Sequence, residues 1–136
     1  MSETKKPTVD EAIENLKEEF KCIMRHHERD LDKYAKKMNE DFEHFFRWQS
    51  DDMYKTTCLV EWLRDFRPVI YLASAEKVEM AIQNYINNTE LELIEGTGIG
   101  TSTNPMQNMA HALAFEAKRE FRADLQRMLY TIQYRG

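Results

Sequence analysis

The chain has 136 residues, of which 42% are hydrophobic and 11% aromatic, a size and composition typical of one folded domain rather than of a disordered segment. Its net charge of −5 disfavours nonspecific binding to nucleic acid, which requires a basic surface. No stretch approaches the ~20 apolar residues of a membrane-spanning helix, and no secretory signal follows residues 1–6. We therefore expect one soluble, cytoplasmic domain over residues 1–136 with a flexible N-terminus over residues 1–7, which excludes a membrane protein.

A long amphipathic helix is predicted near the N-terminus. Thr8 and Glu11 match a capping box, and neither Gly nor Pro occurs from there to Ser50. Apolar side chains recur at intervals of three and four residues, which predicts a first helix of about 40 residues. The stripe includes one polar residue, His27, and consists of Ile13, Leu16, Phe20, Ile23, His27, Leu31, Tyr34, Met38, Phe42 and Phe45.

A second helix begins at about Ser50 and has a wide apolar face. Pro68 interrupts this pattern, because a proline disfavours helical geometry at the residue before it. Residues 69–72 are β-forming types, so a kinked helix and a short extended segment both remain open there.

The rest of the chain predicts two further helices and one loop. A helix follows from about residue 74 and ends at the polar residues 87–89, and a short extended segment is open for residues 90–95. Residues 95–104 form a loop rich in Gly, Thr and Ser. Pro105 suits the first position of a last helix that reaches about residue 133. The expected fold is an all-α bundle of three long helices or of four.

Two polar residues fall on apolar stripes, His27 on the first helix and Asp124 on the last. A buried polar group needs a hydrogen-bonding partner, and these two residues are conceivable partners of one another. If they meet, they would set the register of the helices or respond to pH. The sequence alone does not show that they meet.

The last helix has an inner apolar stripe that should face the core, formed by Met106, Met109, Ala110, Leu113, Ala117, Phe121, Leu125, Met128 and Ile132. It also has a second face, offset from this stripe by about 100°. Aromatic and arginine side chains are enriched at protein interfaces, so this face is a candidate partner surface, with packing inside the chain as the alternative. Phe46 and Trp48 form a lesser candidate around the first turn of the chain. The residues of the second face are His111, Phe115, Lys118, Arg122 and Leu129.

An enzymatic alternative depends on two pairs of carboxylates, Glu40 with Glu43 and Glu61 with Asp65. All-α, magnesium-dependent nucleotide pyrophosphohydrolases place paired carboxylates on neighbouring helices, because the metal needs several oxygen ligands around the phosphates. The second pair is spaced one residue wider than the expected pattern. Carboxylates three or four residues apart are also common on solvated helices.

Neither a resident metal nor a cofactor is predicted. Ferritin-like sites need Glu-x-x-His on two helices, whereas the nearest matches here, His27 with Asp30 and Asp41 with His44, both lie on the first helix. The loop from Gly96 to Gly100 lacks the lysine of a phosphate-binding loop.

A helix with one apolar stripe along about 40 residues must lie against a comparably long surface. We therefore expect a noncatalytic helical interaction module, acting as an adaptor, an inhibitor or an accessory subunit. Its partner would be another protein or a second copy of the chain, with a homodimer expected and nucleic acid disfavoured. The alternative is the magnesium-dependent nucleotide hydrolase.

Overall fold

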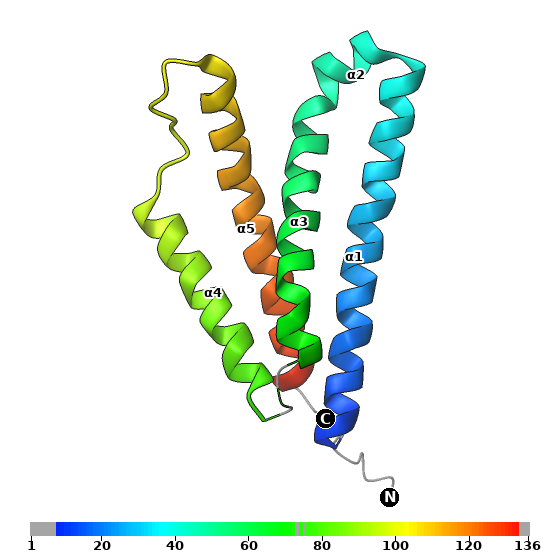
Figure 1. Ribbon diagram of the computed structural model, residues 1–136, viewed down its shortest axis with the longest axis vertical. Coiled ribbons are helices and arrows are strands. Elements are labelled where there is room, and N and C mark those ends of the chain that lie inside the picture. Colours follow the sequence, from blue (N-terminus) through cyan, green and yellow to red (C-terminus); the bar gives the residue numbers. More distant parts are fainter. Residues whose placement is uncertain (1–7, 73, 75, 134–136) are drawn as a thin grey trace, which may run out of the picture.

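The computed structural model describes residues 8–72, 74 and 76–133, and it confirms an all-α bundle (Figure 1). The predicted flexible segment, residues 1–7, lies outside the described residues. Within the described part there are five helices, four long and one short. They are α1 (Val9–Glu40), α2 (Phe42–Trp48), α3 (Ser50–Leu72), α4 (Val78–Glu95) and α5 (Pro105–Gln133).

The first helix is shorter than predicted, with 32 residues instead of about 40. It begins as expected, since the Thr8 side chain accepts a hydrogen bond from the Glu11 backbone at 3.1 Å. It ends because Asp41 leaves helical geometry and its side chain accepts a hydrogen bond from the His44 backbone at 3.2 Å. A carboxylate that caps a new helix competes with the continuing helical hydrogen bonds. The predicted helix is therefore divided into α1 and α2.

Both segments considered as extended structure are helical. Pro68 lies inside α3, which continues through residues 69–72, and Ile70 beyond the proline is only 2% exposed. Burial of that turn against the core offsets the cost of the proline. Similarly, α4 continues through residues 87–89 to Glu95, because Thr89 is buried and its hydroxyl donates to the Tyr85 carbonyl at 2.8 Å.

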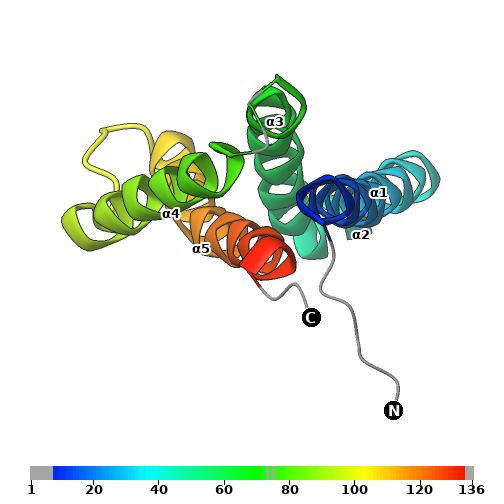
Figure 2. The same ribbon diagram turned by 90° about the horizontal axis from the view of Figure 1, so that it is seen from below.

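Three helices form the centre of the bundle and the fourth long helix lies outside it (Figure 2). α1, α3 and α5 each pack against the other two, and α4 packs mainly against α5 with a smaller contact to α3. Between the described residues, α1 and α4 make no contact, and α2 contacts only α1 and α3. The bundle is thus a triangle of α1, α3 and α5, with α4 packed on the side of α5 away from α1.

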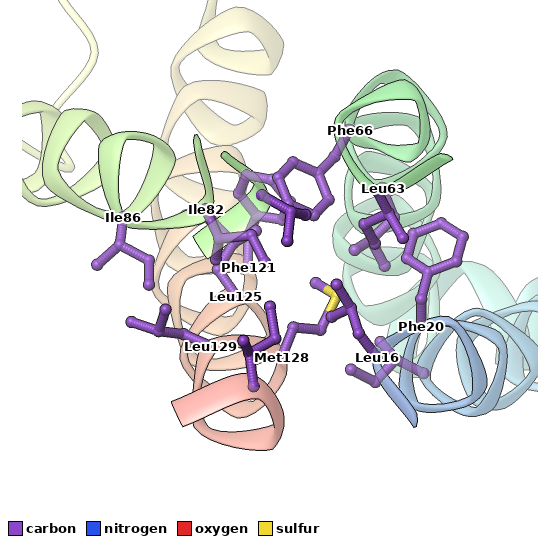
Figure 3. Packing of buried hydrophobic residues seen from close by; sticks show 14 of the residues in the cluster. Leu16, Phe20, Leu63, Phe66, Ile82, Ile86, Phe121, Leu125, Met128 and Leu129 are labelled. Atoms are coloured by element: carbon purple, nitrogen blue, oxygen red, sulfur yellow. The ribbon is translucent and has the colours of Figure 1, made fainter. Parts of the chain in front are cut away.

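The hydrophobic core fills only one half of this bundle. It lies where α1 begins and where α3 and α5 end, and we call this half the closed end (Figures 1 and 3). In α1 the buried residues run from Ala12 to His27, and in α5 all seven lie between Ala117 and Ile132. The largest fully buried side chains include Phe66, Leu16, Leu63, Ile82, Leu125 and Met128.

Candidate functional site

The opposite half of the bundle, which we call the open end, exposes most of the large apolar side chains. It comprises α2, the first turn of α3, the last turns of α4, the loop 96–104 and the first turns of α5. Nine of the fourteen exposed large hydrophobic side chains of the described residues lie there. They are Phe42, Phe46, Trp48, Tyr54, Leu91, Ile94, Ile99, Met106 and Met109. Because exposed apolar side chains that gather in one region mark interaction sites, the open end is the candidate site.

One arm of the open end is the aromatic helix α2. Phe45 is 4% exposed and anchors this helix, while Phe42 and Phe46 stack on one another outside with ring centroids 5.9 Å apart. Trp48 is 71% exposed. The sequence placed Phe42 in the core stripe; that is wrong, because the break at Asp41 turns the helix. Phe46 and Trp48 lie on the surface, as a partner contact would require.

The other arm is formed by the end of α4, the loop 96–104 and the start of α5. Asn108 holds the loop, since its side chain accepts from the Ser102 amide at 2.9 Å and donates to the Ser102 carbonyl at 2.8 Å. A ring nitrogen of His111 also lies 2.9 Å from the Thr97 carbonyl. The exposed Ile99 is therefore presented by a loop with defined hydrogen bonds.

The start of α5 carries an apolar stripe that the described residues leave largely exposed. Met106 and Met109 belong to the predicted inner stripe, yet they are 62% and 49% exposed. Below them Lys55 of α3 pairs with Glu116 of α5 at 3.3 Å. Burial by itself lowers the pKa of Lys55, but the hydrogen bond and charge of Glu116, together with Asp52, raise it above its ordinary value. This ion pair joins α3 to α5 next to the open end.

The predicted partner face of α5 is largely occupied within the chain. Leu129 is 2% exposed, so its assignment to a partner surface is wrong. Lys118 pairs with Glu92 at 2.7 Å, and the Arg122 guanidinium pairs with Glu90 at 2.7 Å. Both acidic residues belong to α4, which covers this face.

The remaining residues of that face, His111 and Phe115, lie at the edge of the open end. They line a shallow pocket of about 250 Å³ with Trp62 and the end of α4. The Lys118 ammonium lies 4.5 Å above the Trp62 ring. Only this upper part of the predicted face remains available to a partner.

His27 and Asp124 meet in the interior. His27 Nε2 lies 2.8 Å from Asp124 Oδ2, and the two residues are 4% and 6% exposed. Burial by itself lowers the pKa of His27, but the hydrogen bond and negative charge of Asp124 outweigh it. With smaller contributions from Glu120 and Asp30, the pKa of His27 lies above its ordinary value of 6.5. The pair joins α1 to α5 at the level where the core ends.

The four carboxylates of the enzymatic alternative lie in two separate places. Glu43 lines a small pocket at α2 and pairs with Arg47 at 3.0 Å. Asp65 lines a different pocket, against α4 and α5. It follows the start of α3 by fifteen residues, which corresponds to about 22 Å along a helix. Glu40 and Glu61 are exposed and belong to no metal-sized group of the described residues.

One group in the described part has the size of a metal site, formed by His26, His27 and Asp30. The ring centroids of His26 and His27 are 5.5 Å apart. His26 is largely exposed and lies 3.6 Å from Asp30. Because His27 already bonds to Asp124, the arrangement is satisfied without a metal.

The sequence pattern did not lead us to predict the exposed apolar residues near the end of α4. Leu91 and Ile94 were left unassigned because residues 90–95 were ambiguous between helix and strand. Their spacing of three residues was the available signal, since it places both on one helical face.

Comparisons with protein-family models, with curated proteins and with solved structures give no match to this chain. Among the described helices, none combines the length and the apolar composition needed to cross a bilayer. The site is therefore interpreted from its own geometry.

Proposed function

We propose that the protein is a noncatalytic helical interaction module that self-associates through its open end. The observation that carries this proposal is the concentration of exposed aromatic and aliphatic side chains at one end of the bundle. Apolar side chains scattered singly over a surface are ordinary, whereas their concentration at one end of the molecule supports a contact that is completed by another molecule.

The composition of the open end supports a protein partner. Phe46 and Trp48 are 57% and 71% exposed, and Met106 is 62% exposed. Aromatic residues and methionine are the types enriched at protein interfaces. A Trp or Tyr buried at the centre of an interface is often a residue whose loss costs about 2 kcal/mol or more.

A second copy of the chain suits the shape of this end. α2 on one arm makes no contact with α4 or α5 among the described residues. The upper residues of α1, Leu31, Tyr34 and Met38, are only half-buried. An arm of an identical chain would cover this surface and have its own covered in return, which is the isologous contact of a twofold dimer. Roughly 800 Å² per partner is needed for a stable contact.

Light scattering and sedimentation equilibrium over a range of concentrations test the proposal. We expect a dimer for the unchanged chain and a shift towards monomer for Phe46→Ser and Trp48→Ser, with the dimer weakened about 30-fold or more by each change. Met80→Ser is the matched control, because Met80 is 70% exposed and lies outside the open end. A monomer at every concentration, or equal effects of the three variants, would refute self-association here.

The enzymatic alternative is tested on the same samples. Incubation with magnesium and a panel of nucleoside triphosphates should leave the nucleotides intact. Magnesium-dependent hydrolysis that is lost in a Glu61→Gln variant would instead favour the carboxylate pairs over a noncatalytic role.

A further inference from the structure

A groove with basic walls lies between α1 and α3, on the side of the molecule away from α4. Its volume is about 400 Å³, which is within the size range of small-ligand sites. It belongs to the closed end and shares no residue with α2. It is lined by Phe20, Lys21, Met24, Arg25, Glu28, Arg64, Arg67 and Tyr71.

The charges of this groove oppose those of the whole chain. Lys21 and Arg25 lie one turn apart on α1, and Arg64 and Arg67 lie one turn apart on α3. Glu28 is the one acidic residue of the lining. The groove therefore carries a local charge of +3 in a protein whose net charge is −5. Like charges one helical turn apart destabilise a helix, so the repulsion within each pair works against the helix that carries it.

The arginines of the groove make none of the close ion pairs that five other cations of the described residues make. In the part of the chain that the structure describes, neither Arg25 nor Arg64 makes an ion pair, and Arg67 contacts only the Tyr71 ring, at 5.0 Å from its centroid. Lys21 has a long contact of 3.4 Å with Glu18. By contrast, acidic groups lie within 3.3 Å of Arg47, Lys55, Lys118, Arg122 and Arg127.

The floor of the groove is apolar and held in place. Phe20 is 4% exposed and belongs to the core, and its ring meets the edge of the Tyr71 ring with centroids 6.4 Å apart. Met24 packs against the same cluster. Guanidinium groups thus surround a fixed hydrophobic floor, an arrangement suited to a ligand with an anionic group and an apolar or ring portion.

We propose that this groove binds a phosphate-bearing ligand. Four cationic side chains within one small groove favour a ligand that carries several negative charges close together. A phosphate group supplies nearly two charges and three strong acceptor oxygens, and the arginine fork binds two of those oxygens at once. Carboxylates along a peptide carry one charge each and are spread over a longer distance. The proposal is independent of self-association at the open end.

The test is a titration of the full chain with pyrophosphate at low ionic strength, in which binding is monitored by the NMR chemical shifts of the backbone amides. We expect saturable shifts centred on residues 20–28 and 64–71, and weaker binding as salt is added. The variant Arg25→Gln/Arg64→Gln should bind about tenfold more weakly or worse. Both arginines are exposed and make no ion pair in the described structure, so the variant should retain its fold.

The matched control is Lys36→Gln/Lys77→Gln, which removes the same two charges at exposed positions outside the groove. It should bind pyrophosphate as the unchanged chain does. Equal weakening in both double variants would mean that net charge alone attracts the anion, and the proposal would be overturned.

Vesicles of phosphatidylcholine, with and without phosphatidic acid, distinguish the source of the phosphate. Shifts with pyrophosphate and no cosedimentation with vesicles indicate a soluble ligand. Cosedimentation that needs phosphatidic acid and is lost in Arg25→Gln/Arg64→Gln indicates a lipid headgroup. The absence of both pyrophosphate-induced shifts and groove-dependent cosedimentation would refute phosphate binding.

Discussion

The buried pair of His27 and Asp124 allows a quantitative prediction. The change His27→Leu removes the only hydrogen-bonding partner that the structure gives to the Asp124 side chain, whose exposure is 8%. A carboxylate in that position keeps its desolvation cost without a compensating contact. The change Asp124→Leu should lower the free energy of unfolding by less, because a neutral His27 is cheaper to bury than an unpaired carboxylate.

The size of the effect follows from the burial of both partners. Breaking a buried ion pair on one side typically costs about 3–5 kcal/mol. With side-chain exposures of 5% and 8% and a separation of 2.8 Å, we expect His27→Leu to lie in that range. A loss of about 3 kcal/mol corresponds to a fall of about 10 °C in Tm for a domain of this size. The double variant His27→Leu/Asp124→Leu should recover most of the loss, since an apolar pair can replace a buried ion pair.

The pH dependence has a definite sign. The pKa of His27 is raised in the folded protein, so its protonated form contributes stability that is fully present below the unfolded pKa of about 6.5. This contribution is lost as pH rises through the higher folded pKa. The unchanged chain should therefore lose stability relative to the double variant above about pH 6.5.

Urea denaturation of the unchanged chain, the two single variants and the double variant between about pH 5.5 and pH 8.5 measures both effects. The double variant is the reference, because neither position titrates in it. The reasoning fails if His27→Leu and Asp124→Leu cost less than about 0.5 kcal/mol each, which is ordinary for surface positions. It also fails if the stability difference from the double variant does not change with pH.

Three further changes test the packing and the loop. Phe66→Ala should lower the free energy of unfolding by about 3–5 kcal/mol, because Phe66 is 0% exposed; a small loss in calorimetry would contradict the described core. Gly100→Ala would place a methyl group 2.7 Å from Asn108 Cα and should cost about 1–3 kcal/mol, with changed amide shifts confined to the loop. Pro68→Ala should stabilise the protein by about 1–2 kcal/mol by restoring a helical hydrogen bond, and a lower Tm would argue against a continuous α3.

Much of the fold was predictable, because hydrophobic periodicity reports which residues face a core. The break at Asp41 was not predictable, since it arises because the Asp41 side chain caps the N-terminus of α2 and the backbone at Asp41 leaves helical geometry. The periodicity of the apolar residues alone does not distinguish this break from a continuous helix. Pro68 and residues 69–72 were ambiguous for a related reason. Their helical state is selected by burial of Ile70, and burial is a property of the assembled bundle.

The candidate site was predictable only in part. Phe46 and Trp48 were identified as surface aromatics, and both are exposed. Leu129 was misplaced and Met106 was assigned to the core, because the direction of a stripe does not say whether another helix covers it. His27 and Asp124 were identified as conceivable partners because each falls on an apolar stripe, but they are 97 positions apart, and a single sequence does not show that such residues meet. The basic groove combines two pairs of cations from two helices, which only tertiary contact brings together.

The uneven packing along the bundle has a consequence for how sequence change is tolerated. Amide hydrogens at the closed end, around Leu16, Leu63 and Leu125, should exchange only through global unfolding, whereas those of α2 and the first turns of α5 should exchange through local opening. Substitutions at the open end should therefore change the exposed surface while leaving the folding equilibrium nearly unchanged. Selection can thus vary the surface of one end of the molecule while the other end keeps the helices in register.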